Sequence, residues 1–268
     1  NNYVKFANFY WRIVRINGDG SIRMIYDGTS AHENGEASED RTIGLSGYSK
    51  AYFDNAGVDY MFGKYDSTSY SLTHANINDS TIKKYVDNWY ENNLKDGGYE
   101  QYLTDNLFCN DRSISKIVPD EYTNKGYGME PTAYRWYYGP WDNENDNNSK
   151  LNCSRSDSFT VFDGINGNTS LSYSIGLIAN DEVVLAGGWN VANLNYYLYI
   201  GQYYWTMTPE RFSQKSKCAG VHFVAFDGRA DLHDGSNSDR SYVKPVINLK
   251  PNSLKFGDGT INNPYVVE

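Results

Sequence analysis

Residues 9–26 read FYWRIVRINGDGSIRMIY, and this stretch decides how the chain begins to fold. Apolar and arginine side chains alternate on both sides of the tetrapeptide NGDG at 17–20, imperfectly before it and regularly after it. Such alternation is typical of strands that bury one face, and Asn, Asp and Gly tolerate the positive φ of a tight turn. The sequence therefore predicts a β-hairpin here.

A second clear pattern, over residues 80–96, is helical. Apolar side chains repeat there at the spacing of one helical face, at Ile82, Tyr85, Val86, Trp89 and Tyr90. The polar side chains between them are expected to face solvent, namely Lys83, Lys84, Asp87, Asn88 and Glu91. Asn78-Asp79-Ser80 offers a start signal and Gly97-Gly98 a stop signal. Shorter helices are predicted at residues 99–106 and 180–186.

The C-terminal third predicts short strands, at residues 203–207, 221–226 and 242–249. Residues 115–172 show little periodicity, which argues against a doubly wound or barrel fold. No linker composition interrupts the chain, so we expect a single domain over residues 1–268. Because 9–16 and 242–249 are apolar runs near the two ends, we also expect the terminal strands to pair.

Composition excludes several classes of protein. The formal net charge is −9 and the sequence pI is about 5.0, whereas nucleic-acid binding leaves a basic footprint, so no nucleic acid is expected as a partner. With 16% aromatic residues, the chain is expected to fold. No stretch approaches the roughly 20 apolar residues of a membrane span. A start at Asn1, without Met or signal peptide, is compatible with an export segment or a membrane or pilus anchor upstream.

The three cysteines, Cys109, Cys153 and Cys218, have no CxxC spacing, so a structural zinc site is not expected. One disulfide and one thiol would suit an exported protein, and three thiols would suit a cytosolic one. Their number leaves both alternatives open. The four histidines share no motif with Cys or Glu that suggests a ligand set, so neither a metal ion nor a cofactor is expected.

Several segments resemble, in order, those of the bacterial proteins grouped as the DUF6273 type. They are FYWRIVRINGDGSIRMIYDG at the start, IKKYVDNWYENNL and LFCNDRSI in the middle, and GLIANDEVVLAGG, YYWTMTP, VHFVAFDGRADL and YVKPVINLKPN toward the end. Together they cover most of the chain. The family is similar to the C-type-lectin-like superfamily, which also holds the formylglycine-generating enzyme and the variable proteins of diversity-generating retroelements.

The resemblance implies an α+β fold of the C-type-lectin-like kind, with small twisted antiparallel sheets, two main helices and extensive irregular loops. It implies export, and so an extracellular or cell-surface location. Cysteines recur in the family at the positions of Cys109 and Cys153, which implies a disulfide between them, with Cys218 remaining a thiol. Formylglycine-generating catalysis needs two thiols near the C-terminal site, where the sequence has Cys218 alone. We therefore expect no enzyme activity.

Two ways of binding a cation are less favoured. Lectin-type binding of sugar through calcium is one, because Glu130-Pro131-Thr132 and Trp141-Asp142-Asn143 match the lectin motifs only superficially. Oxygen ligation by a cluster of aspartates is the other, because turn residues between strands explain the cluster more simply. These aspartates are Asp227, Asp231, Asp234 and Asp239.

The C-terminal third carries the strongest signal for binding. WNVANLNYYLYIGQYY at 189–204 and DGSNSDRSY at 234–242 are crowded with Tyr, Asn, Ser and Asp, the residue types of antibody binding loops. In retroelement-diversified proteins of the lectin fold, mutation of Asn codons produces these same types. The alternative is an ordinary Tyr-rich surface or core, because the whole chain is rich in Tyr and Asn. The candidate ligand-binding residues are Trp189, Asn190, Asn193, Asn195, Tyr197, Tyr199, Arg211, Asp234, Asn237, Asp239 and Arg240.

We therefore expect a ligand-binding domain displayed on a bacterial or phage surface, with an extracellular protein or a glycan as its ligand. Trp205 and residues 221–226 are expected to form a rigid platform beneath the binding loops. Two alternatives are kept. The first is a structural, pilin-like surface subunit, and the second, less favoured, is an enzyme of the formylglycine-generating type.

Overall fold

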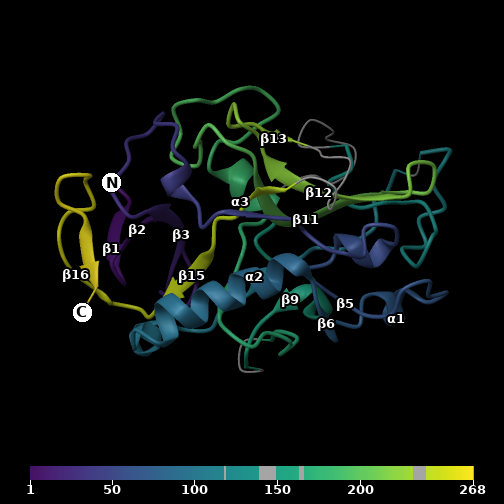
Figure 1. Ribbon diagram of the computed structural model, residues 1–268, viewed down its shortest axis with the longest axis horizontal. Coiled ribbons are helices and arrows are strands. Elements are labelled where there is room, and N and C mark those ends of the chain that lie inside the picture. Colours follow the sequence, from purple (N-terminus) through teal and green to yellow (C-terminus); the bar gives the residue numbers. More distant parts are fainter. Residues whose placement is uncertain (118, 139–148, 163–165, 232–239, 268) are drawn as a thin grey trace.

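The computed structural model describes residues 1–117, 119–138, 149–162, 166–231 and 240–267 (Figure 1). Over these residues the protein is mixed α+β, with many short strands and few helices, as the sequence predicts. Two larger sheets form its frame, and the helix α2 (Thr81–Tyr90) contacts strands of both.

Among the described residues, the first sheet has seven strands in the order β10, β15, β3, β2, β1, β17, β16. Their bounds are β1 (Tyr3–Phe6), β2 (Phe9–Ile16), β3 (Ile22–Gly28), β10 (Ile175–Gly176), β15 (Val246–Leu249), β16 (Leu254–Phe256) and β17 (Tyr265–Val267). The antiparallel pair β2 and β3 confirms the predicted hairpin, with Ile13 opposite Met24. At its turn, the Asn17 amide donates to the Ser21 carbonyl at 2.8 Å, and Gly20 has a φ of +82°.

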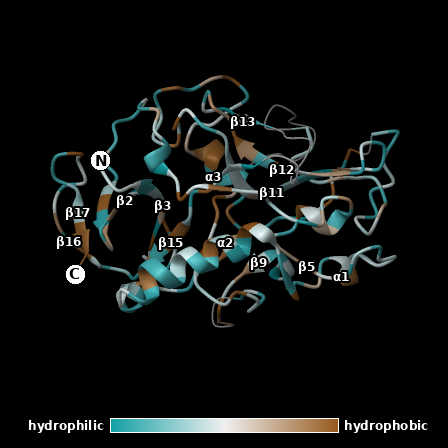
Figure 2. Ribbon diagram, viewed as in Figure 1, coloured by the Kyte–Doolittle hydropathy of each residue, from teal (hydrophilic) through white to brown (hydrophobic). Residues whose placement is uncertain are grey.

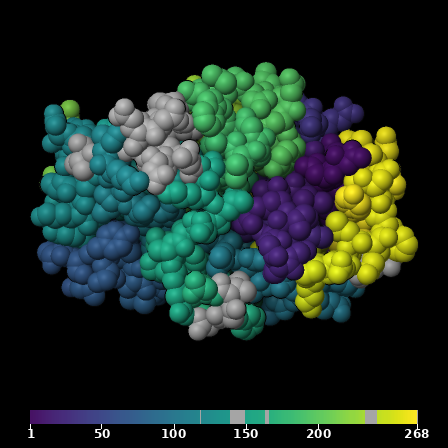
Figure 3. All heavy atoms as spheres, turned by 180° about the vertical axis from the view of Figure 1, so that it is seen from behind, coloured from purple at the N-terminus to yellow at the C-terminus, as the bar shows by residue number. Residues whose placement is uncertain are grey.

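The two ends of the chain meet in this sheet. β1 pairs with β17 in parallel, with Val4 opposite Tyr265, and β15 pairs with β3. The expected pairing of terminal strands is confirmed. Residues 9–16 and 242–249 are nevertheless not direct neighbours, because β3 lies between β2 and β15. Figure 3 shows the N-terminal segment in purple and the C-terminal segment in yellow side by side on the back of the molecule.

The second sheet has six strands within the described ranges, in the order β13, β12, β11, β14, β4, with β8 also pairing with β11. Their bounds are β4 (Leu45–Ser46), β8 (Thr132–Ala133), β11 (Tyr204–Ser213), β12 (Cys218–Val224), β13 (Ala230–Asp231) and β14 (Ser241–Tyr242). The long pair β11 and β12 overlaps the predicted strands at 203–207 and 221–226, but β11 begins at Tyr204 and continues to Ser213, and β12 begins earlier, at Cys218, and ends at Val224. Two small pairs complete the strands, β5 (Met61–Phe62) with β6 (Asn78–Asp79) and β7 (Phe108–Cys109) with β9 (Ser158–Phe159).

The predicted main helix is confirmed as α2, which continues as the π-helical turn η3 (Glu91–Lys95). The Ser80 hydroxyl accepts a hydrogen bond from the Lys83 amide at 3.2 Å, as a capping residue does. The expectation that the Lys83 side chain faces solvent is wrong. This side chain is fully buried, and its Nζ pairs with Asp79 at 3.2 Å and Asp87 at 2.5 Å.

The remaining helices of the described chain are short. They are α1 (Tyr70–Thr73), α3 (Asn180–Leu185), and the 3-10 turns η1 (Glu39–Arg41), η2 (Asn55–Val58), η4 (Tyr99–Tyr102) and η7 (Arg155–Asp157). The helix predicted at 180–186 is therefore confirmed as α3. The helix predicted at 99–106 is a single 3-10 turn, because the Thr104 amide bonds instead to the Asn248 carbonyl at 3.0 Å.

A continuous hydrophobic core joins both sheets to α2. In Figure 2, the brown apolar residues of α2 mark the face with which this helix covers the core. Trp89 of α2 packs against the hairpin, with its ring centroid 6.1 Å from that of Trp11 and 5.6 Å from that of Tyr26. In the second sheet Trp205 is fully buried, and its Nε1 donates to the Ser46 carbonyl at 2.9 Å. Burying each such aromatic contributes on the order of 2 kcal/mol to stability.

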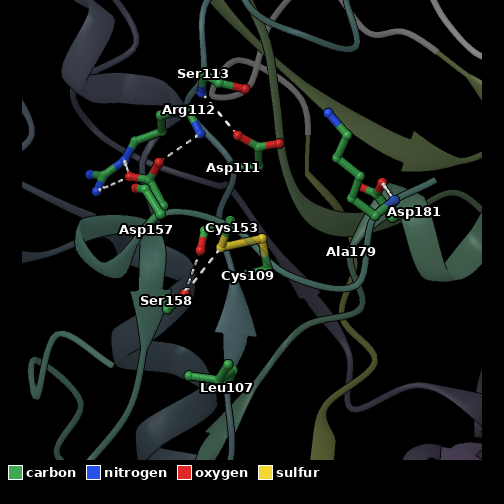
Figure 4. Close-up of a disulfide and its surroundings, with 12 residues drawn as sticks. Leu107, Cys109, Asp111, Arg112, Ser113, Cys153, Asp157, Ser158, Ala179 and Asp181 are labelled. Atoms are coloured by element: carbon green, nitrogen blue, oxygen red, sulfur yellow. Dashed lines mark hydrogen bonds and ion pairs between the residues drawn. A yellow bond between two sulfur atoms is a disulfide. The ribbon is translucent and has the colours of Figure 1, made fainter. Parts of the chain in front are cut away.

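A disulfide joins Cys109, at the end of β7, to Cys153, just before β9 (Figure 4). The two Cα atoms lie 5.9 Å apart. Beside it, Nε of Arg112 donates to Asp157 at 2.7 Å, which holds the two strands in place. The pairing implied by the resemblance is therefore confirmed, and Cys218 keeps its thiol.

Candidate functional site

The loop from Gly187 to Asn195 carries the first candidate residues. Trp189 is 44% exposed, and its neighbours Val191 and Leu194 are 61% and 49% exposed. Asn195 is exposed and Asn190 is half-buried. Large apolar side chains are thus gathered at the surface of one loop, which is unusual unless they contact a partner.

Hydrogen bonds to a neighbouring turn hold this loop in one conformation. The Asn193 amide donates to the Asp227 carbonyl at 3.0 Å, and the Ala230 amide donates to the Trp189 carbonyl at 3.0 Å. Gly228, at a φ of +82°, packs against the Asn193 carbonyl so closely that a Cβ atom would not fit. Because β12 and β13 flank this turn, the loop is attached to the second sheet.

A buried arginine holds the next part of the same segment. Nη2 and Nη1 of Arg41 donate to the carbonyls of Tyr197 and Tyr199 at 2.8 and 2.7 Å. Arg41 itself pairs with Asp27 at 2.8 Å, and both side chains are fully buried. In Figure 3 this segment, in green, lies beside the N-terminal strands.

Tyr197 and Trp189 do not form one aromatic patch. Tyr197 lines a groove with Val14 and Leu185, and its ring centroid lies 5.6 Å from the Arg12 guanidinium. Burial raises the pKa of the Tyr197 phenol, and the neighbouring Glu182 raises it further. Tyr199 is half-buried. The two tyrosines therefore belong partly to the packing against the first sheet.

The remaining candidates divide into three groups. Arg211 lies at the far end of β11, opposite Gly220 and Ala133. At about 3.3 Å per residue, this is roughly 20 Å along the strand from Tyr204. Arg240 is exposed and donates to the Leu45 carbonyl at 3.3 Å. Three candidates lie outside the described residues: Asp234, Asn237 and Asp239.

Arg240 is one of the residues that line an open pocket of about 470 Å³ on the second sheet. Segments far apart in the sequence line it: Leu45, Gln202, Tyr203, Phe223, Asp231, Arg240, Ser241 and Tyr242. We call this the β14 pocket, because β14 contributes two of these residues. The ring of Tyr203, which lines this pocket, packs against the Phe226 ring with centroids 5.4 Å apart, and the two residues are 39% and 50% exposed.

The charged groups beside the β14 pocket are partly paired. Nε of Arg229 lies 2.9 Å from Asp231 and 3.4 Å from Asp227. Of the acidic cluster considered as a cation site, the two described members, Asp227 and Asp231, therefore share one arginine of the chain, which offsets one of their two charges. A paired carboxylate can still accept hydrogen bonds from a ligand at its other lone pairs.

The expected platform is largely present. Trp205 and Val221 are completely buried, and Phe223 is 3% exposed. Phe226, also expected in the platform, is instead exposed, because it lies beyond the end of β12 and next to the turn at Asp227.

Sequence reasoning included Tyr203 and Tyr242 in its two binding segments and Phe226 in the platform, but it named none of the three as a ligand-binding residue. One local signal was present, since Phe226 directly precedes Asp227-Gly228, and an aromatic side chain beside a tight turn has little core around it. No comparable signal marks Leu45, which β14 brings into the pocket by pairing with β4.

Within the described ranges, no group of three or more His, Cys, Asp and Glu side chains is placed to hold a metal ion. Among these residues, no helix has both the length and the apolar character that a membrane crossing requires. No protein-family model, no curated protein and no solved structure matches this chain. The C-type-lectin-like superfamily therefore stays a prediction from the sequence.

Proposed function

We propose that this protein is a binding domain that recognises an extracellular protein or a glycan through the β14 pocket and the adjoining Trp189 loop. The observation that carries the proposal is an exposed aromatic pair: Tyr203 lines an open pocket directly before β11, and Phe226, just after β12, packs against its ring. Aromatic side chains of this kind supply most of the binding energy at recognition sites, and they also stack on sugar rings.

Rigidity and polarity support the same proposal. The backbone beneath the site is the ladder of β11, β12 and β14, and the Trp189 loop is hydrogen-bonded to the turn at 225–230. A ligand would therefore lose little affinity to the cost of ordering loops. Asp231 of β13 and Arg240, directly before β14, both line the pocket and offer an acceptor and donors for the polar groups of a ligand.

The wider setting belongs to the same proposal. We propose a C-type-lectin-like fold, display on a bacterial or phage surface, and diversification of the C-terminal region by a retroelement. The disulfide between Cys109 and Cys153 is compatible with an oxidising location. It also supports binding rather than formylglycine-type catalysis, because the bridge leaves Cys218 without a second thiol for a copper-binding pair.

The test compares single alanine variants on a glycan array and on a panel of immobilised surface proteins. Tyr203→Ala and Phe226→Ala should each reduce capture of the bound ligand by tenfold or more, since an aromatic anchor contributes about 2 kcal/mol or more. Both variants should keep the melting temperature of the parent, because both side chains are substantially exposed.

Phe256→Ala is the matched control. This aromatic side chain is 60% exposed but lies on β16, at the edge of the other sheet. Equal loss of capture in Phe256→Ala would contradict the proposed location of the site. Failure of the parent protein to capture any glycan or surface protein would contradict the proposed function.

A second candidate function is a pilin-like structural subunit. The observation that favours it is β16, an edge strand whose Phe256 is exposed, since such an edge can pair with a neighbouring subunit. In that case Phe256→Ala should weaken self-association measured by analytical ultracentrifugation, while Tyr203→Ala should leave it unchanged.

A further inference from the structure

The Tyr-rich segment that leads from the Trp189 loop toward β11 is held in place by two side chains of other elements. Three successive carbonyls of this segment accept hydrogen bonds from them. Nη2 of Arg41 donates to the Tyr197 carbonyl at 2.8 Å, and Nη1 donates to that of Tyr199 at 2.7 Å. The Tyr204 hydroxyl donates to the Leu198 carbonyl at 2.9 Å. The conformation of the segment therefore depends on the positions of Arg41 and Tyr204.

Lys244 lies against both of these side chains. It follows β14 in the chain and is fully buried. Its Nζ donates to the main-chain carbonyl of Arg41 at 3.0 Å and lies 5.5 Å from the centroid of the Tyr204 ring. The same Nζ is 3.6 Å from Oδ1 of Asp27, the carboxylate with which Arg41 pairs at 2.8 Å. A change in the charge of Lys244 therefore acts directly on the side chains that hold the segment.

The cluster around Asp27 contains more positive than negative charge. Arg12 of β2 also faces this carboxylate, with Nη1 3.5 Å from Oδ2. Three cationic side chains thus share one carboxylate, and each of the four side chains is at most 3% exposed. A buried charge without a counter-charge is costly, and a group that can lose its proton becomes neutral instead.

Lys244 is the cation of this cluster that can lose its proton, because an arginine stays protonated in proteins. Burial lowers the pKa of Lys244 from 10.5 to about 7, against the opposing effect of Asp27. The charges of Arg41 and Arg12 lower this pKa as well. The Tyr204 phenol, which also faces Lys244, stays neutral in this range because burial raises its pKa.

We propose that Lys244 is a proton-linked lock on the Tyr-rich segment: its neutral amine favours the closed segment, and uptake of a proton favours an open one, in which Arg41 and Tyr204 release the three carbonyls. Opening exposes the amine to water, where it holds a proton more tightly than in the closed state. The open population should therefore grow about tenfold for each pH unit from about 10.5 down to about 7, and stay constant below that.

This inference deepens the proposed function, since it concerns how often a segment beside the proposed site is ordered, but its test needs no ligand. The test is amide hydrogen exchange of the full chain, corrected for the intrinsic exchange rate at each pH. The Tyr199 amide bonds to the Tyr196 carbonyl at 3.1 Å, and the Ser38 amide bonds to the Ile200 carbonyl at 3.0 Å. Protection of both should fall about a hundredfold from about pH 9 to about pH 7. Low urea should not change it, because a local opening exposes little surface.

Two variants locate the effect. Lys244→Met has no side-chain proton to take up, so the protection of both amides should be independent of pH. Lys250→Met removes an exposed lysine close to it in the sequence and should behave as the parent does.

The charge state of Lys244 is measured directly by NMR of the parent protein with isotope-labelled lysine. One side-chain signal should titrate near pH 7, a result that requires no variant. The proposal is overturned if no lysine signal titrates there, if low urea accelerates exchange at both amides, or if Lys244→Met keeps the pH dependence. None of these outcomes involves ligand capture, so the proposed function is tested separately.

Discussion

Nη2 of Arg41 donates to the Tyr197 carbonyl at 2.8 Å, and this contact attaches the Tyr-rich segment to the first sheet. The same guanidinium reaches Tyr199 through Nη1 at 2.7 Å and pairs with Asp27 of β3. One buried side chain thus sets the position of the backbone that leads from the Trp189 loop into β11. The geometry of the candidate binding face depends on a residue that no ligand could touch.

Replacing Arg41 with methionine should strongly destabilise the protein. The change leaves Asp27 buried without its closest partner and removes the donors to Tyr197 and Tyr199. Breaking a buried ion pair by removing one partner costs about 3–5 kcal/mol. Urea unfolding followed by tryptophan fluorescence measures this loss. Arg240→Ala, at an exposed arginine, should change the free energy of unfolding by no more than about 0.5 kcal/mol.

Truncating Trp189 should destabilise the protein much less than truncating Leu198. Trp189→Ala should lower the free energy of unfolding by less than about 1 kcal/mol, because the side chain is 44% exposed. Leu198→Ala, at a fully buried side chain of the same segment, should cost about 2–5 kcal/mol. Thermal unfolding of both variants tests this contrast. A large loss of stability in Trp189→Ala would place Trp189 in the packing and remove it from the binding face.

Ionisation of the buried Glu210 carboxyl should lower the free energy of unfolding as the pH rises toward neutrality. Burial raises the pKa of this carboxyl from 4.5 to about 7, although Arg211 beside it acts in the opposite direction. Because the folded state holds the proton more tightly, the stabilisation is complete below pH 4.5 and is lost by about pH 7. A shift of this size corresponds to about 3 kcal/mol.

Glu210→Gln should abolish this pH dependence. The quantity to follow is the difference in free energy of unfolding, parent minus variant. It should fall between pH 4.5 and about 7 and should stay constant above about pH 7. Urea unfolding at several pH values measures the difference. Glu121→Gln, at an exposed carboxylate, is the control and should show no such fall. A level difference for Glu210→Gln would show that the carboxyl titrates alike in both states.

Loss of the Cys109–Cys153 bridge should also destabilise the protein. The bridge closes a loop of sequence separation 44, and the chain-entropy relation gives about 4 kcal/mol for a loop of this length. Cys153→Ser should show this loss in the oxidised protein. Cys218→Ser should not, since Cys218 takes no part in the bridge. Dithiothreitol should lower the melting temperature of the parent and leave that of Cys153→Ser unchanged.

Where local signals were strong, the sequence by itself determined the structure. The hairpin around Asn17 and Gly20 follows from alternation and from a turn that needs a positive φ. α2 follows from helical spacing and from the Ser80 cap. The hairpin and the helix depend on interactions between residues close together in the sequence. Their physical causes can therefore be read from the local sequence. The disulfide followed from a resemblance rather than from spacing.

Only the tertiary structure decided the burial of Lys83 and the composition of the β14 pocket. The i, i+4 spacing of Asp79, Lys83 and Asp87 is visible in the sequence and makes them neighbours. That the rest of the chain covers Lys83 at this place is not visible there. The β14 pocket joins Leu45 to Tyr203 through strands that are far apart in the sequence. Local patterns report which face of an element is apolar. Which elements then contact one another depends on the packing of the whole core. The binding pocket forms where such elements, distant in the sequence, lie side by side.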